Sequence, residues 1–340
     1  MNFLCTYKKN AQELQRALIT EGIISRDVKP QQHGDRVCFP IIDNADLTIL
    51  SKYNINNVKK EMHRAVKTAK IRHYSDLLKS ELSDEQVKSL PKSYDVVGSV
   101  AIIEISDEID AKKVGSAILC VSKNVKTVLL KKSERSTDFR LYELELIAGE
   151  AQSETIHKES GFLFKLDPKF VYFSPREGTE RERIASFVQS NEKILVMFAG
   201  VGPYAFYCAK RTNNEIYAVE MNPKAVEYLR ENILLNKSEN IIPIEGDAKT
   251  FCIEHLNTFD RIFMPLPRKA EEFLSSAFDS CKNNGVIHFY SWGVEPDVFE
   301  DPIKRIENHI KGSYKIIKMQ KVLPYAPKVY KVRIDIQKIQ

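Results

Sequence analysis

Residues 194–204 have the sequence ILVMFAGVGPY. The apolar run at the start of this stretch predicts a buried strand, and Gly200 and Gly202 follow it directly. Glycine allows the sharp turns that bring a loop close to a ligand where the next helix begins, so we expect a larger side chain at Gly202 to block that ligand. The loop alone is a weak sign of a nucleotide site, and the sequence around it has to support the assignment.

Four more short apolar runs follow, and helical patterns such as residues 223–236 separate them. The runs lie at residues 215–219, 241–244, 261–264 and 285–290. This alternation predicts an α/β domain over residues 168–340, with an open parallel sheet covered by helices on both faces. We expect residues 328–336 to join the sheet as an antiparallel strand at its edge.

The sequence before this domain divides into three parts. We expect a small α/β domain over residues 1–58, a basic helical linker over 59–93 and an α+β middle domain over 94–167. The linker is predicted because residues 59–73 carry six bases against one acid and have helical character. A segment of this kind is either a solvated surface helix or a contact for a phosphate backbone.

Composition narrows the class of protein. The 340 residues include 51 Lys and Arg against 46 Asp and Glu, a net charge of +5 that permits nucleic-acid binding without requiring it. Without an apolar stretch of about 20 residues or a signal-peptide core, we expect a cytoplasmic protein that does not enter a membrane. The six cysteines form no CxxC pair and the seven histidines are isolated, so we expect reduced, packing cysteines and no metal site.

Two acidic residues support a nucleotide site beside the glycine loop. Glu220 ends the second strand 20 residues after Gly200 and is placed to accept both hydroxyls of a ribose. With Ala205, the loop also fits the G-x-G-x-x-A dinucleotide pattern, so an NAD-dependent oxidoreductase remains an alternative. Asp247, after the third strand, is placed to bind an adenine amino group, and this three-strand pattern resembles class I methyltransferases that use S-adenosylmethionine (SAM).

Further motifs resemble one family along the whole chain. They are residues 94–98, 105–108, 143–144, 148–150, 155–159, 173–176, 180–181, 198–203, 222–223, 246–247, 266–267 and 325–327. In this order they resemble the archaeal and eukaryotic tRNA (guanine-37-N1)-methyltransferases. The resemblance implies a monomer with an N-terminal domain that reads the outer corner of tRNA and a class I SAM domain that methylates guanine-37.

The resemblance also implies roles for individual residues. Guanine N1 carries a proton at neutral pH, so a base must remove it before the nitrogen attacks the methyl group, and Glu180 is the candidate. A carboxylate is too weak to do this unaided, and Arg140 matches a guanidinium that would stabilise the charge developing on O6. Contacts with SAM are implied for Arg181, Phe198, Gly200, Gly202, Glu220, Met221, Asp247, Ala248 and Pro265, and contacts with the target base for Tyr172 and Pro267.

Each of these roles has a structural alternative. Glu180 is also a suitable carboxylate for the first turn of a helix, and Arg140 for a phosphate contact. Arg181 would serve equally in a structural salt bridge, and Tyr172 as a core aromatic residue.

The chain departs from the family at two positions. Val196 stands where the family usually has Asp ahead of the glycine loop, and Pro265 stands where it has the Asn of Asn-Leu-Pro. Proline has no amide side chain and no backbone N–H, although its carbonyl is still able to accept a hydrogen bond. These departures leave two further alternatives: an enzyme that also methylates C7 of 4-demethylwyosine at the same tRNA position, and a tRNA-binding protein without activity.

Overall fold

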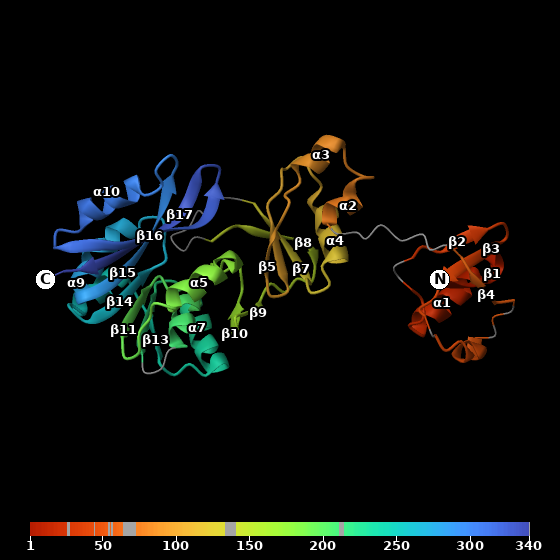
Figure 1. Ribbon diagram of the computed structural model, residues 1–340, viewed down its shortest axis with the longest axis horizontal. Helices are drawn as coiled ribbons and strands as arrows, with labels where there is room; N and C mark the ends of the chain where they lie inside the picture. Colours follow the sequence, from red (N-terminus) through yellow and green to blue (C-terminus); the bar gives the residue numbers. More distant parts are fainter. Residues whose placement is uncertain are drawn as a thin grey trace. The chain divides into compact units, whose positions relative to one another are not determined.

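The computed structural model describes residues 1–25, 28–43, 45–53, 55, 57–63, 73–132, 141–210 and 214–339. The chain forms two compact units, Met1–Leu77 and Leu78–Gln340. Figure 1 shows the two units, with labels on many of their helices and strands. In the described parts of the chain, no helix is both long enough and apolar enough to cross a bilayer.

The first unit is a four-stranded sheet with one long helix on one face. The strands are β1 (Asn2–Tyr7), β2 (Gln31–His33), β3 (Arg36–Pro40) and β4 (Lys59–Met62), in the order β2-β3-β1-β4 and antiparallel throughout. Helix α1 (Lys8–Thr20) buries Leu14 and Leu18 against one face, and the short helix η1 (Thr48–Tyr53) follows. Helix α2 (Tyr74–Leu78) spans the boundary between the two units. The other face carries Phe3, Cys5 and Cys38.

The predicted basic linker helix is wrong for residues 59–62. These residues form strand β4, whose Lys60 lies opposite Leu4 of β1, so the first unit extends beyond residue 58. Four polar residues at a sheet edge carry no apolar pattern, and only their pairing with a distant strand makes them a strand. Residues 64–72 of the predicted helix lie outside the described residues.

The expectation that every cysteine is reduced is also wrong. Cys5 and Cys38 are direct partners in the register of β1 and β3, and their sulfur atoms form a disulfide. A separation of 33 residues concealed this pairing in the sequence. Cys208, Cys252 and Cys281 are buried free thiols, as expected, whereas Cys120 is free but exposed.

The second unit begins with the α+β arrangement that the sequence predicts. Helices α3 (Asp84–Ser89) and α4 (Ala111–Val121) accompany a sheet of β5 (Asp95–Val97), β6 (Val100–Ile103), β7 (Thr127–Lys131) and β8 (Leu144–Gly149), in that order. Only β6 and β7 are parallel. A hairpin of β9 (Thr155–Glu159) and β10 (Phe162–Leu166) leads into the last part of the chain.

A seven-stranded sheet forms the rest of the unit and confirms the predicted α/β class. Its order is β13-β12-β11-β14-β15-β17-β16. The strands are β11 (Lys193–Met197), β12 (Glu215–Glu220), β13 (Ile241–Glu245), β14 (Phe259–Met264), β15 (Cys281–Val294), β16 (Tyr314–Ala326) and β17 (Val329–Lys338). The helices are η2 (Pro175–Glu177), α5 (Gly178–Ala185), α6 (Pro203–Ala209), α7 (Pro223–Asn236), α8 (Ala248–Glu254), η3 (Ala270–Phe273), α9 (Leu274–Ser280) and α10 (Glu300–His309).

The tail strand is antiparallel as expected, but it does not lie at the edge. β17 pairs with β15 on one side and with β16 on the other, so β16 is the edge strand. The side chains of β16 are mostly exposed or half-buried, whereas six consecutive residues of β17 are buried. The polar sequence of β16 concealed a strand that exists because β17 offers it a partner.

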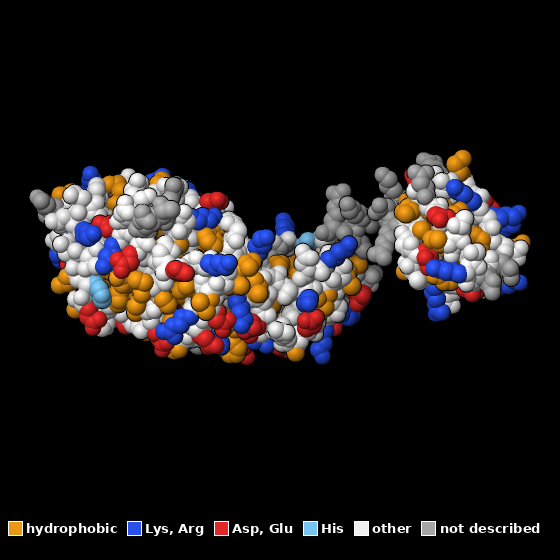
Figure 2. All heavy atoms as spheres, turned by 90° about the horizontal axis from the view of Figure 1, so that it is seen from below, with side chains coloured by type: hydrophobic (Ala, Val, Ile, Leu, Met, Phe, Trp, Pro, Cys, Tyr) orange, Lys and Arg blue, Asp and Glu red, His pale blue; other side chains and the backbone are white. Residues whose placement is uncertain are grey.

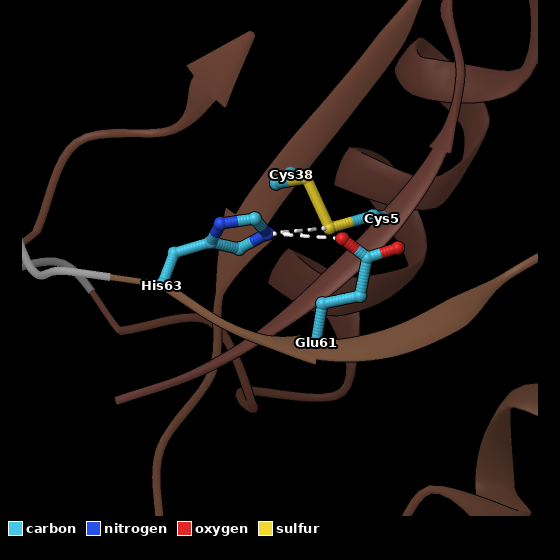
Figure 3. Close-up of side chains that lie close together, drawn as sticks. All are labelled: Cys5, Cys38, Glu61 and His63. Carbon is cyan, nitrogen blue, oxygen red and sulfur yellow. Dashed lines mark hydrogen bonds and ion pairs between the residues drawn. A yellow bond between two sulfur atoms is a disulfide. The ribbon is translucent and has the colours of Figure 1, made fainter. Parts of the chain in front are cut away.

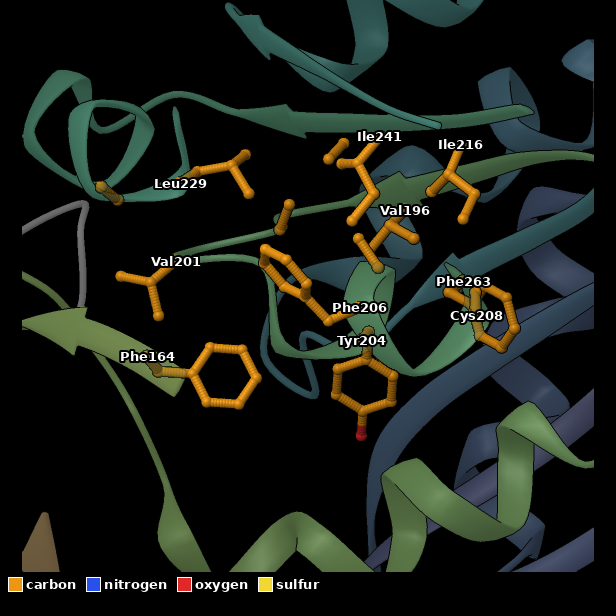
Figure 4. Packing of buried hydrophobic residues seen from close by; sticks show 14 of the residues in the cluster. Phe164, Val196, Val201, Tyr204, Phe206, Cys208, Ile216, Leu229, Ile241 and Phe263 are labelled. Carbon is orange, nitrogen blue, oxygen red and sulfur yellow. The ribbon is translucent and has the colours of Figure 1, made fainter. Parts of the chain in front are cut away.

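The core fills both faces of the sheet. On one face, Phe164 of β10, Val196 of β11 and Phe206 of α6 belong to a single apolar cluster (Figure 4). Val196, the first departure from the family pattern, is fully buried in this cluster. The valine therefore fills core space, and the change from Asp removes a polar group from an apolar environment.

Candidate active site at the carboxyl edge of the parallel sheet

The glycine loop turns sharply at the end of β11. Phe198, Gly200 and Gly202 have φ angles of +55°, +56° and +95°, in the left-handed region that suits glycine. A Cβ atom on Gly202 would lie 2.5 Å from Leu229 Cδ1 and 2.8 Å from Phe206 Cε2. A larger side chain at Gly202 would therefore meet helices α6 and α7 and not ligand space, because the missing side chain makes room for helix packing.

Gly200 has different surroundings. A Cβ atom there would meet only the backbone oxygen of Tyr172, at 3.7 Å, among the described residues. The space beside the loop thus opens at Gly200. Phe198, whose strained φ angle is unusual for a large residue, packs edge-on against Phe273 with ring centroids 4.8 Å apart.

Glu220 holds this edge of the sheet together. Its Oε2 accepts a hydrogen bond from the Gly200 N–H at 2.8 Å, and its Oε1 accepts one from the Asn222 N–H at 2.8 Å. Its backbone oxygen accepts a bond from the Gly246 N–H at 3.0 Å. One residue therefore links the ends of β11, β12 and β13, and the neighbouring Met221 side chain is half exposed at 49%.

Asp247 lies at the end of β13 and caps helix α8. Its Oδ1 accepts hydrogen bonds from the Thr250 N–H at 2.8 Å and the Thr250 hydroxyl at 3.2 Å. The following Ala248 is buried. The structure thus brings the ends of the first three strands to one edge, as the sequence pattern predicts, and adds a capping role for this carboxylate.

A buried ion pair lies beneath the end of β14. The Lys331 Nζ donates to the Glu177 carboxylate at 2.9 Å and to the Pro265 backbone oxygen at 3.2 Å. Burial lowers the pKa of Lys331, although Glu177 opposes the shift. Burial by itself would raise the pKa of Glu177, but the charge of Lys331 outweighs this effect and holds that pKa below its usual value.

This pair defines the environment of the second departure. The carbonyl of Pro265 accepts a bond from a lysine of β17, in agreement with the expectation that it remains an acceptor. Pro267, two residues further on, is buried. The Tyr204 hydroxyl donates to Glu177 at 3.1 Å and attaches this network to helix α6.

Glu180 is buried and engaged on both carboxylate oxygens. Its Oε1 accepts from the Tyr290 hydroxyl at 2.7 Å and from Arg333 Nη1 at 2.6 Å, while its Oε2 pairs with Arg183. Only 3% of Glu180 is exposed. To act as a base, the carboxylate would have to release a partner, and Arg183, whose side chain is 31% exposed, is the partner nearest to solvent.

Arg333 carries the network further into the protein. Its Nε donates to the Asp335 carboxylate at 2.8 Å, and that carboxylate accepts from His288 Nδ1 at 2.7 Å. Arg261 Nη1 lies 2.8 Å from His288 Nε2. Because arginine only donates, Nε2 must accept, so His288 is neutral with its proton on Nδ1. Burial lowers the pKa of His288, in keeping with a neutral ring.

Arg181 forms the structural salt bridge that the sequence left open. Its guanidinium donates to both oxygens of Glu159, at 2.9 and 2.8 Å, and to the Ser174 backbone oxygen at 2.8 Å. The face of Phe173 lies 5.1 Å from it. Tyr172 is 38% exposed beside the loop, and Arg140 lies outside the described residues.

Sequence reasoning missed most of this buried charge. Lys331, Arg333 and Asp335 alternate with apolar residues along β17, a pattern that normally indicates a solvent-exposed face. Here both faces of β17 are covered, and Arg333 meets Glu180 of helix α5. The alternation of charged and apolar residues in β17 was visible in the sequence, but it did not show that acidic residues of other elements cover the charged face.

The two described bases at the end of strand β7 are paired. Lys131 pairs with Glu104, and Lys132 lies 2.9 Å from Glu145, while Arg135 and Arg140 lie outside the described residues. On the face seen in Figure 2, basic and acidic side chains are interspersed. Lys59 and Lys60 of β4 are exposed bases of the first unit.

Known proteins match this chain along nearly its whole length. Residues 155–317 match the TRM5/TYW2 methyltransferase domain, and residues 74–152 match the TYW2 N-terminal domain. The chain is 35% identical over 335 residues to tRNA (guanine(37)-N(1))-methyltransferase Trm5b of Pyrococcus abyssi. This alignment covers 96% of each protein. It is 34% identical over 265 residues to tRNA (guanine(37)-N(1))/4-demethylwyosine(37)-methyltransferase Taw22 of Nanoarchaeum equitans, covering 63% of this chain and 88% of the relative.

Solved structures agree with these matches. The chain superposes on aTrm5, solved as a complex with tRNALeu, with a TM-score of 0.73, 35% identity and complete coverage of both chains. It matches Methanocaldococcus jannaschii TYW2, solved with AdoMet, with a TM-score of 0.56 and 32% identity, covering 73% of this chain and all of the other. The antiparallel β17 between β15 and β16 also differs from the parallel dinucleotide-binding order, which removes the basis for the oxidoreductase alternative. The chain belongs to the TRM5/TYW2 methyltransferase family, with the class I methyltransferase fold.

Proposed function

We propose that this protein transfers the methyl group of SAM to N1 of guanine-37 in tRNA. The observation that carries the proposal is the carboxyl edge of the sheet, where Glu220 bonds Gly200 beside open space. Relatives that match nearly the whole chain at 35% and 36% identity are named tRNA (guanine(37)-N(1))-methyltransferases. The matching aminocarboxypropyltransferase of M. jannaschii covers 71% of the chain, whereas the two methyltransferases each cover 96% of it.

The residues at this edge fit SAM. The backbone of Phe198 and Gly200 would border the cofactor, and the Glu220 carboxylate would accept the ribose hydroxyls. Asp247 would accept from the adenine amino group, while Met221 and Ala248 supply apolar contact. SAM itself supplies a methyl group on a sulfonium, and the positive charge of that sulfonium suits an edge that carries two carboxylates.

The base that removes the N1 proton is proposed to be Glu180. It lies in the first turn of helix α5, and its Oε1 is held by Tyr290 and Arg333, which fixes the position of the carboxylate. Departure of Arg183 would free Oε2 to take a proton. Hydrogen bonds at catalytic residues often reach their working geometry only with substrate bound, so pairing in the ligand-free protein is compatible with this role.

The remaining substrate contacts are proposed from the family pattern. Tyr172 would contact the target base from the side of the loop, and Pro267 would line the pocket. Arg140 would lie against O6 of guanine. Arg181 would act indirectly, because its guanidinium is occupied by Glu159 and Ser174 and so positions the segment that carries Tyr172.

A second candidate activity is methylation of C7 of 4-demethylwyosine at the same position. Pro265 favours it, since the absent Asn changes the groups that face the target base, and the relative Taw22 is named for both reactions. Lys331 donates to the Pro265 carbonyl, so a buried cation lies next to this altered segment and distinguishes the pocket from one built around an amide.

One experiment tests both activities. Purified protein is incubated with SAM and either a guanine-37 tRNA transcript or tRNA bearing the tricyclic base, and the digested RNA is analysed by mass spectrometry. We expect one added methyl group on guanine-37 and none on a transcript with adenine at position 37. A gain of an aminocarboxypropyl group on the tricyclic tRNA, or no product despite SAM and tRNA binding, would contradict the proposal.

A further inference from the structure

The face of the N-terminal sheet opposite helix α1 gathers four side chains that commonly bind metals. They are Cys5 of β1, Cys38 of β3, Glu61 of β4 and His63, which follows β4 directly. One ligand atom from each lies within 4.8 Å of those of the other three (Figure 3). We call these residues the Cys–His–Glu cluster. Their spacing along the chain matches no metal motif, so the antiparallel pairing of three strands creates the cluster.

The potential ligand atoms of the cluster face one another. His63 Nε2 lies 3.5 Å from Cys5 Sγ and 3.1 Å from Glu61 Oε2, so one ring nitrogen faces both a sulfur and a carboxylate. Cys5 and Cys38 are each 1% exposed and pack with Phe3 and other apolar residues. Glu61 and His63 are half-buried, so among the four residues of the cluster they are the more accessible to solvent.

Neighbouring residues hold the two polar ligands in place. Arg36 Nη1 donates to Glu61 Oε1 at 2.9 Å and leaves Oε2 turned to His63. The imidazole is packed edge-on by Phe3, at 5.4 Å, and stacked on His33, at 4.7 Å. Outer contacts of this kind orient metal ligands in proteins.

We propose that the reduced protein binds one zinc ion at the Cys–His–Glu cluster. Zinc takes four tetrahedral ligands from thiolate, imidazole and carboxylate groups, and this set supplies two sulfurs, one nitrogen and one oxygen. Two thiolates favour zinc over magnesium or calcium, which prefer oxygen ligands. The site is structural, since it would join β1, β3 and β4 and uses all four positions.

The disulfide and the metal are alternative states of the same residues. A small dithiol reduces the Cys5–Cys38 disulfide by exchange, so that the reductant becomes a disulfide and two cysteine thiols form. Zinc then binds the two sulfurs as thiolates and releases two protons to solvent. Oxidation removes both sulfur ligands together and so abolishes the site.

Cobalt(II) provides a direct test on the full-length chain. The protein is reduced with a dithiol, treated with a chelator, desalted without oxygen and titrated with Co²⁺. We expect a thiolate-to-cobalt charge-transfer band and the strong visible bands of tetrahedral cobalt, saturating at one ion per chain and abolished by Zn²⁺. The same chain with its disulfide closed should show neither signal.

Variants locate the site. Cys38→Ser should abolish the charge-transfer signal of the cluster, whereas Cys120→Ser, which changes an exposed free cysteine, should leave it intact. Arg36→Met should weaken cobalt binding by about 10–100-fold, the usual effect of losing an outer contact. Should Cys38→Ser fail to fold, the cobalt charge-transfer band of the unaltered chain, compared between its reduced and oxidised forms, still tests the proposal. A reduced chain without the charge-transfer band, or a band that persists in folded Cys38→Ser, would overturn the proposal.

Discussion

Replacing Gly200 by alanine tests whether the glycine loop faces a ligand. The added methyl group would meet only the Tyr172 oxygen, at an ordinary contact distance of 3.7 Å, among the described residues. Its effect on folding is therefore limited to the left-handed backbone at φ +56°, which costs about 1–2 kcal/mol for an L-residue. If SAM occupies the open space, the same methyl group collides with the cofactor.

Gly202→Ala is the matched control. It introduces the same methyl group two residues away, but there the new atom would lie 2.5 Å from Leu229 and 2.8 Å from Phe206. Overpacking of a core costs about 1–3 kcal/mol, which adds to the backbone cost at φ +95°. We expect this variant to lose about 2–5 kcal/mol of unfolding free energy, more than Gly200→Ala.

Two measurements separate the effects. Trp292, the single tryptophan, lies in β15, so its fluorescence during urea unfolding reports on the C-terminal unit. Isothermal titration gives the affinity for SAM. We expect Gly200→Ala to bind SAM at least about tenfold more weakly, equivalent to about 1.4 kcal/mol, while its unfolding free energy falls by no more than about 2 kcal/mol. Folded Gly202→Ala should bind SAM more tightly than Gly200→Ala does. Unchanged SAM affinity in Gly200→Ala would refute the assignment of the loop.

Three further outcomes are expected from the buried charges. Glu180→Gln should keep SAM and tRNA binding while single-turnover methyl transfer falls by about 10²–10⁴, the usual contribution of a general base. Asp335→Asn also removes a carboxylate partner of the buried Arg333, but it should keep most of the methyl-transfer rate. Equal losses of rate in the two variants would assign Glu180 a structural role. Lys331→Met should lower the unfolding free energy by about 3–5 kcal/mol because it leaves the Glu177 carboxylate buried without its cation. Adding Glu177→Gln should restore part of this free energy. No recovery in the double variant would contradict the pairing. The pKa values of His288 and Asp335 lie below their usual values, so each group contributes its full stabilisation above its unfolded-state pKa and loses it as pH falls toward the folded-state pKa. The unfolding free energy, followed by Trp292 fluorescence, should therefore fall below about pH 6.5. The fall should be smaller in His288→Asn.

Local sequence determined the central part of the fold. Each apolar run of the parallel sheet is short and bounded by polar residues, so neighbouring residues alone indicate a buried strand. The glycine loop and Glu220 were recognisable because the carboxyl ends of adjacent parallel strands meet at one edge of the sheet. Residues that follow successive strands in the sequence are therefore neighbours in the structure. The family motifs added Glu180 and Arg181 as residues of interest.

Tertiary structure decided which partners these residues have. The alternating charges of β17 are typical of a solvent-exposed face, yet each has a partner on another element: Lys331 pairs with Glu177 of η2, Arg333 with Glu180 of α5 and Asp335 with His288 of β15. Likewise, Cys5, Cys38 and His63 are unremarkable along the chain and become neighbours through strand register. The physical reason is the same in each case: periodicity depends on adjacent residues, whereas burial of charge and the meeting of ligands depend on which distant segment packs against them.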